Sequence, residues 1–129
     1  MKRILFPILL VVISLLSACQ SKEMVFSGEG EQWLAKVTVS QTYGDESYTI
    51  EISYKGEGVK TIETISYDIE SSHKELLEYG VHEASLNEQG VYKDQMLSSN
   101  SSSTTSEEEF VLEVEWKGES EIFILKNDV

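Results

Sequence analysis

The sequence predicts an all-β domain, a single antiparallel β-sandwich with about seven short strands. From Trp33 onward, apolar side chains alternate with polar ones at a period of two, which is typical of half-buried strands. Short turn segments that contain glycine, around residues 44–45, 55–58 and 117–120, separate these stretches at near-regular spacing. Hardly any segment shows the longer period of a helix. A small barrel is the alternative arrangement of such strands.

The expected strands follow one another closely along the chain. They cover residues 33–40, 48–54, 59–69, 81–86, 90–93, 110–117 and 121–125. In the third of them, Ile62 is out of phase with Ile65 and Tyr67, so we expect a bulge or a strand break near Glu63. The stretch 110–117 alternates most regularly, and the last strand has apolar residues on both faces.

Two segments between the strands differ from this pattern. Ser72 and Glu75 have the spacing of a capping box and Gly80 could end a helix, so residues 71–80 predict a single helical turn. Residues 98–109 contain no apolar side chain and therefore predict a mobile loop.

Length and composition are compatible with one domain. The chain has 129 residues, of which 40% are hydrophobic, which is enough for a packed core. We expect Trp33 and Trp116 to fill that core, with exposed contact aromatics as the alternative. The formal net charge is −13, and a surface this acidic repels nucleic acid and anionic lipid head groups. It favours solubility, cations or basic partners, so we predict no nucleic-acid partner.

The N-terminal segment has the order of a secretion leader. Lys2 and Arg3 precede an apolar run over residues 4–16, which is too short to span a bilayer and has the length of a signal-peptide core. The chain continues with Leu16-Ser17-Ala18-Cys19, which resembles the lipobox of bacterial lipoproteins. The resemblance implies that a diacylglyceryl group is attached to the Cys19 sulfur and that the leader is cut between Ala18 and Cys19.

The predicted organisation follows from this leader. Residues 1–18 are the lipoprotein signal peptide, residues 19–31 are the lipidated Cys19 and a polar tether, and residues 32–127 are the β-sandwich domain. The expected location is the outer, extracytoplasmic face of a cell membrane, to which the lipid on Cys19 anchors the chain. The alternative is an ordinary secretion signal, with Cys19 as a free thiol. One cysteine allows no disulfide within the chain.

A second resemblance covers most of the chain after the leader. The segments "FSGEGEQW", "YTIEISYKG" and "VEVEWKGESEIFIL" are similar to those of small bacterial lipoproteins of the bacilli type, a family without an assigned activity. They share a Gly/Glu-rich entry to a tryptophan and a closing W-x-G-x-x-E hairpin. The resemblance implies an immunoglobulin-like sandwich and favours a Gram-positive host. It provides no functional residues.

Few residues suggest a specific chemistry. The segments "GEGEQW" and "GESEIF" could meet if the first and last strands are neighbours, and their carboxylates could then bind calcium. These carboxylates belong to Glu29, Glu31, Glu119 and Glu121. The run Glu107–Glu109 is expected to be solvated, with a docking face for a basic partner as the alternative.

The two histidines, His73 and His82, cannot form a Cys/His metal site with a lipidated cysteine. We expect His82 to be an ordinary surface residue of a strand. No Gly-x-Ser-x-Gly, Walker or dinucleotide-binding motif is present, and no cofactor is predicted. The resulting hypothesis is a non-enzymatic binding or accessory module at the cell surface, with a protein or cell-wall partner. The alternatives are an assembly factor for an envelope protein complex and, with least support, a hydrolase.

Overall fold

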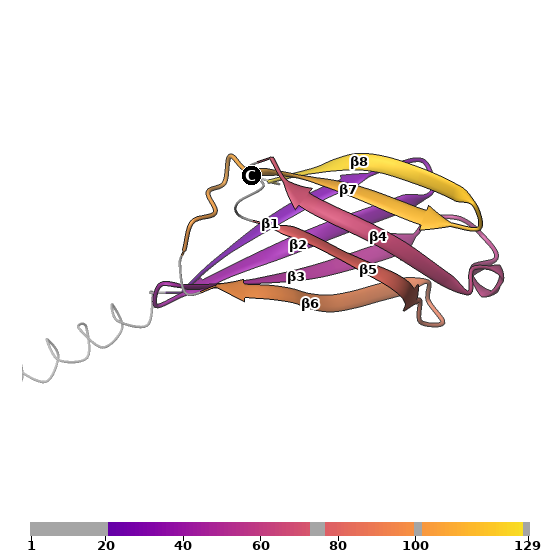
Figure 1. The fold of residues 1–129 in the computed structure, drawn as a ribbon, viewed down its shortest axis with the longest axis horizontal. Coiled ribbons are helices and arrows are strands. Elements are labelled where there is room, and N and C mark those ends of the chain that lie inside the picture. The colour runs from indigo at the N-terminus through magenta and orange to yellow at the C-terminus, as the bar shows by residue number, and fades with distance from the viewer. Residues whose placement is uncertain (1–20, 73–76, 100–101, 128–129) are drawn as a thin grey trace, which may run out of the picture.

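The computed structural model describes residues 21–72, 77–99 and 102–127. Within these ranges the chain forms antiparallel strands and one short 3-10 turn, η1 (Val59–Thr61), and Figure 1 shows their arrangement. The strands are β1 (Ser21–Glu29), β2 (Trp33–Thr42), β3 (Asp45–Tyr54), β4 (Thr64–Ser71), β5 (Glu78–Ser85), β6 (Val91–Ser99), β7 (Glu109–Trp116) and β8 (Glu119–Asn127).

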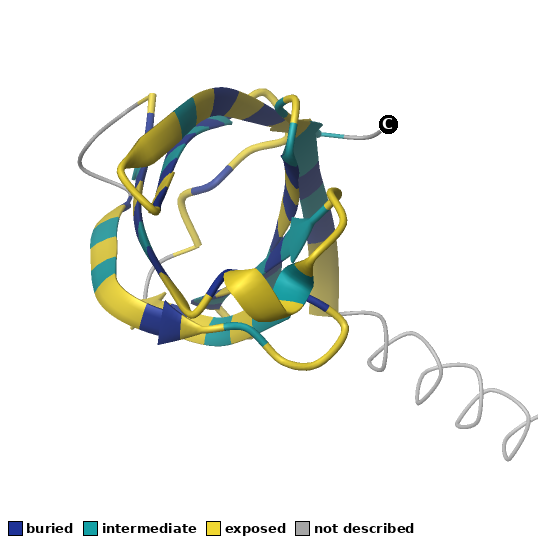
Figure 2. Ribbon diagram, turned by 90° about the vertical axis from the view of Figure 1, so that its right-hand side faces the viewer, coloured by how far each residue is buried: buried dark blue, intermediate teal, exposed yellow. Residues whose placement is uncertain are grey.

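All eight strands belong to one sheet with the order β5-β4-β7-β8-β1-β2-β3-β6. Seen end-on in Figure 2, the sheet curls until its edge strands β5 and β6 approach each other, which gives a nearly closed barrel. The predicted all-β, antiparallel fold is confirmed. The arrangement is not that of a seven-stranded sandwich, because β1 pairs with β8 and joins the two four-stranded halves. Only Phe26↔Asn127 and Ser27↔Lys126 pair at this joint.

The segment predicted as a tether, residues 19–31, contains a strand that the sequence analysis missed. Residues 21–29 form β1, which pairs with β2 along its whole length, from Ser21↔Thr42 to Glu29↔Leu34. Met24 and Phe26 point into the core and are buried. Apolar and polar residues alternate only briefly in this strand, and charged and glycine residues flank it, so the sequence pattern alone does not indicate a strand. The sheet therefore includes residues 21–29, ahead of the predicted start of the domain at residue 32.

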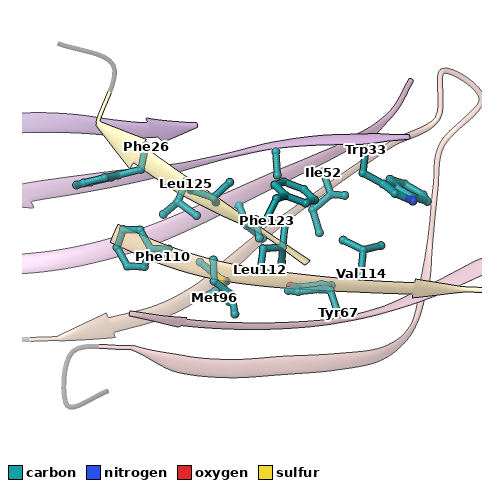
Figure 3. Close-up of a cluster of buried hydrophobic side chains, with 14 of the residues drawn as sticks. Phe26, Trp33, Ile52, Tyr67, Met96, Phe110, Leu112, Val114, Phe123 and Leu125 are labelled. Atoms are coloured by element: carbon teal, nitrogen blue, oxygen red, sulfur yellow. The ribbon is translucent and has the colours of Figure 1, made fainter. Parts of the chain in front are cut away.

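A single core fills the inside of the curled sheet (Figure 3). The Trp33 and Trp116 rings pack edge to face at 5.4 Å between centroids, and Phe26 meets Phe110 in the same way at 4.9 Å. Both tryptophans are buried, which confirms their predicted place in the core. Burying side chains of this size contributes about 1.5–3 kcal/mol each, so this core is the main stabilising feature.

Several expected boundaries can be compared with the structure. The break near Glu63 is confirmed, since η1 ends at Thr61 and β4 starts at Thr64. Of the helical turn predicted over residues 71–80, residues 73–76 lie outside the described part of the chain. The remainder is not helical, because Gly80 lies within β5.

Both edge strands carry a β-bulge. Against β4, the register of β5 shifts between Val81 and Ala84, where Glu83 adopts a φ of 58°. Against β3, the register of β6 shifts between Gln95 and Ser98. Bulges of this kind twist an edge strand and hinder its pairing with another chain.

The joint between β1 and β8 requires a glycine, and this generates a prediction. A Cβ on Gly28 would lie 2.1 Å from the backbone oxygen of Ile124 in β8. We expect Gly28→Ala to push the two strands apart and to lower the free energy of unfolding by about 1–3 kcal/mol, measured by urea denaturation.

Gly44→Asn is the matched control for this substitution. Gly44 has a φ of 84° and open space around its Cβ position, and asparagine tolerates that conformation. The control should stay within about 0.5 kcal/mol of the parent. Equal stability of Gly28→Ala and the parent would contradict the proposed role of Gly28.

Candidate functional site

The predicted lipidation and cleavage residues, Cys19 and Ala18, lie outside the described residues. The described chain starts two residues after Cys19, at the first residue of β1. In residues 21–72, 77–99 and 102–127, no helix has the length and apolar character needed to cross a membrane.

The four glutamates considered for calcium do not form a site. The first and last strands are neighbours, as expected. The Glu29 carboxylate, however, pairs with the Lys55 ammonium group at 3.0 Å, and Glu121 accepts a hydrogen bond of 2.9 Å from the backbone N–H of Gln32. Glu31 and Glu119 are exposed. Within the described ranges, no three His, Cys, Asp or Glu side chains are grouped so that they could hold a metal ion.

Of the two histidines, His73 lies outside the described residues. His82 is exposed on β5, at the bulge of that edge strand, which agrees with its interpretation as a surface residue of a strand.

The first notable polar cluster lies where the two sheet edges meet. The Tyr79 hydroxyl of β5 donates a hydrogen bond of 3.1 Å to Asp94 Oδ2 of β6, and the Tyr67 hydroxyl of β4 lies 3.5 Å from the same oxygen. The Tyr92 ring packs on Tyr67 with 5.6 Å between centroids. These contacts bridge β5 and β6, which share no backbone ladder in the described chain.

The environment of this tyrosine–aspartate cluster favours neutral phenols. Burial raises the pKa of Tyr67 most strongly, and the neighbouring Tyr92 and Asp94 raise it further. The pKa of Tyr79 is also raised, first by burial and then by its hydrogen bond to Asp94. The cluster can therefore hold Asp94 with protonated donors at neutral pH, which is a structural role: it closes the side of the barrel.

The second polar cluster surrounds Glu46, which is 2% exposed. Its carboxylate accepts hydrogen bonds from the Tyr48 hydroxyl at 2.5 Å, the Gln41 amide at 2.7 Å and the Thr104 backbone N–H at 3.1 Å. Burial alone would raise the pKa of Glu46, but these hydrogen bonds outweigh it and lower the pKa. Burial and the hydrogen bond to Glu46 raise the pKa of Tyr48 to about 12.

A second buried carboxylate holds the same loop at its other end. Glu108 accepts hydrogen bonds from the backbone N–H of Ser72 at 3.0 Å, from the Ser72 hydroxyl and from the Glu109 backbone N–H. Of the mobile loop predicted over residues 98–109, residues 102–108 form a loop that Thr104 and Glu108 link to the barrel by hydrogen bonds. Residues 98–99 and Glu109 belong instead to β6 and β7. The prediction of a solvated Glu107–Glu109 run is wrong for Glu108, which is buried, whereas Glu107 is exposed and Glu109 half-exposed.

Side chains fill the inside of the barrel, whereas the outer surface has hollows. One hollow of about 690 Å³ lies beside β1 and is lined by Lys22, Met24, Glu107 and Lys126, among others. A groove of about 500 Å³ runs across β5, β4, β7 and β8.

The groove across β5, β4, β7 and β8 is lined by both acidic and apolar residues. Asp68 stands directly opposite Glu113, and Glu70 stands opposite Glu78. Like charges in such cross-strand positions destabilise a sheet. The exposed Ile122 of β8 contributes the apolar surface. We call this feature the acidic groove.

No protein-family model, no curated protein and no solved structure matches this chain.

The buried polar clusters were missed although the sequence contains a signal for them. Glu46 stands in phase with the inward residues Tyr48 and Ile50, and Asp94 stands in phase with Tyr92 and Met96. A carboxylate at an inward position of a strand must be hydrogen-bonded, because an unpaired buried charge is costly. This rule could have identified both residues.

The first prediction from these clusters concerns the bridge between β5 and β6. We expect Tyr79→Phe to lower the free energy of unfolding by about 1–2 kcal/mol, because it removes a hydrogen bond to a carboxylate. Amide exchange in β5 should accelerate as well. The control is Tyr43→Phe, at an exposed turn, which should cost less than about 0.5 kcal/mol. Equal effects of the two substitutions would contradict the bridging role.

The second prediction concerns the pH dependence that Glu46 causes. Because its pKa is lower in the folded state, its stabilising effect is complete above the ordinary glutamate pKa of about 4.3 and is lost as the pH falls through the lowered value. We expect Glu46→Gln to be less stable than the parent at pH 7, and the difference to shrink in acid. Chemical denaturation at several pH values measures this, and parallel pH profiles would contradict it.

Proposed function

We propose that the chain is a membrane-anchored extracytoplasmic lipoprotein whose barrel is a non-enzymatic binding or accessory module at the cell surface. The observation that carries this proposal is the order of basic residues, apolar run, small residues and Cys19, followed two residues later by the first strand of a folded domain. A diacylglyceryl group has two acyl chains, which makes release from the membrane very slow.

The outer surface is the part of the domain that supports a binding role. Side chains fill the interior, so a partner meets the outside of the sheet. The acidic groove fits a basic partner best, because a positive charge would relieve the repulsion between Asp68 and Glu113. This favours a protein or a cationic wall polymer over a neutral glycan.

An assembly factor for an envelope protein complex is the second candidate, and the acidic groove favours it as well. Crosslinking in intact cells separates the two functions. A binding module should shift its unfolding temperature with an isolated ligand, whereas an assembly factor should remain unchanged alone and crosslink to one protein.

The anchor is tested by one substitution. We expect Cys19→Ser to move the protein from the membrane fraction to the soluble fraction, because the thioether to the lipid cannot form. Ser17→Ala is the control, since a small residue is kept at that position, and it should stay with the membranes. If the Cys19→Ser protein still sediments with membranes after a high-salt wash, the proposed lipid anchor is wrong.

A further inference from the structure

One end of the barrel lies next to the start of β1. Ser21 pairs with Thr42, the last residue of β2, and the two-residue turn Tyr43–Gly44 follows directly. The Ser102 hydroxyl lies 3.5 Å from the Asp45 carbonyl oxygen, so the loop between β6 and β7 covers the same end. We call this the Tyr43 end; it consists of residues 21–23, 41–46, 98–99 and 102–107.

Tyr43 has no structural reason to be a tyrosine. Its exposed fraction is 76%, the largest among the exposed large hydrophobic residues of the described chain. It adopts a φ of 52°, and Gly44 adopts a φ of 84°, as in the tight hairpin turns that favour asparagine, aspartate or glycine. A bulky side chain is unfavourable in this conformation, and its ring gains little packing there. An external contact is therefore the best explanation for the tyrosine.

The Tyr43 end has fewer exposed charged side chains than the opposite end. Its outward side chains are mostly hydroxyls, and its exposed charged residues are Lys22, Glu23, Asp45 and Glu107. The hydroxyl residues are Thr42, Ser98, Ser99, Ser102, Ser103, Thr105 and Ser106. The opposite end, which holds the turns at residues 30–32, 55–63, 86–90 and 117–118, is densely charged. It carries Glu31, Lys55, Glu57, Lys60, Glu63, Glu88 and Lys117.

Chain length limits how far the Tyr43 end can lie from the lipid. Consecutive Cα atoms are 3.8 Å apart and only Gln20 lies between Cys19 and Ser21, so the two steps from Cys19 to Ser21 span about 7 Å at most. Thr42 is the cross-strand neighbour of Ser21, and Tyr43 follows it. A lipid on the Cys19 sulfur would therefore hold this end at the level of the head groups.

We propose that the Tyr43 end of the barrel rests on the membrane surface, with the Tyr43 ring inserted among the lipid head groups. This inference rests on the proposed lipid anchor. Tyrosine is enriched at membrane interfaces because its ring is apolar and its hydroxyl remains hydrated. The Tyr43 end also brings fewer exposed charged side chains to the lipid surface than the opposite end would, four against seven, so less charge has to lose water there. The acidic groove then lies on the side of the barrel, accessible to a partner.

Site-specific labelling tests this orientation. With Cys19 lipidated, an introduced cysteine is the only free thiol of the mature protein. We would label Tyr43→Cys and Lys117→Cys with an environment-sensitive fluorophore and place each lipidated protein in vesicles of phosphatidylethanolamine and phosphatidylglycerol that contain brominated lipid. Lys117 is the matched control, since it has a φ of 48° in the equivalent turn at the opposite end. Asp45→Cys provides a second label at the Tyr43 end.

The proposal expects labels at positions 43 and 45 to lose most of their fluorescence to the brominated lipid, and the label at 117 to keep it. Similar quenching at both ends, or no quenching at either while the protein sediments with the vesicles, would overturn the orientation but leave the anchor intact. Recovery of the protein without lipid on Cys19 would overturn the anchor and the orientation together. Mass spectrometry of the purified protein separates these outcomes.

Discussion

The close approach of β1 to β8 at Gly28 is the contact on which this architecture depends. It joins two four-stranded halves into one sheet, although only two residue pairs connect them. Without this joint the halves would face each other as the two layers of a sandwich. With it, the inward side chains of all eight strands share one core around Trp33, Phe110 and Leu112. A single hydrogen-bonded surface therefore encloses the core on every side except between β5 and β6.

Hydrogen-bonded carboxylates, the half-buried Asp94 and the buried Glu46 and Glu108, complete the enclosure where backbone pairing stops. Asp94 joins β6 to β5 through Tyr79, Glu46 fixes Thr104, and Glu108 fixes Ser72. Each of these carboxylates accepts hydrogen bonds from neutral donors, which for the buried Glu46 and Glu108 compensate for part of the cost of burying the charge. The hydrogen bonds of Glu46 and Glu108 also hold the polar loop over one end of the barrel. Polar residues therefore stabilise the closed barrel at places where an additional strand or a larger core would otherwise be needed.

The sequence predicted the strand content, the strand break near Glu63 and the two core tryptophans, because local alternation determines these features. It did not predict β1, since Gly28 is required by a contact with Ile124 that is distant in the chain. For the same reason it could not distinguish a nearly closed barrel from a sandwich, because two pairs between β1 and β8 decide the difference. Glu29, Glu31, Glu119 and Glu121 suggested a cation site because the two segments have a similar composition, but the folded chain does not group their carboxylates. Glu46 and Asp94 differ from these glutamates, because their inward phase in the strands marks them as residues that need hydrogen-bond donors.

We propose that a lipid on Cys19 anchors the barrel through its first strand, and the mature N-terminus tests this connection most directly. Trypsin should release the peptide from Cys19 to Lys22 from membrane-extracted protein. We expect this peptide to begin at Cys19 and to carry the mass of a diacylglyceryl group. A peptide with an unmodified Cys19, or one that begins before Cys19, would contradict it.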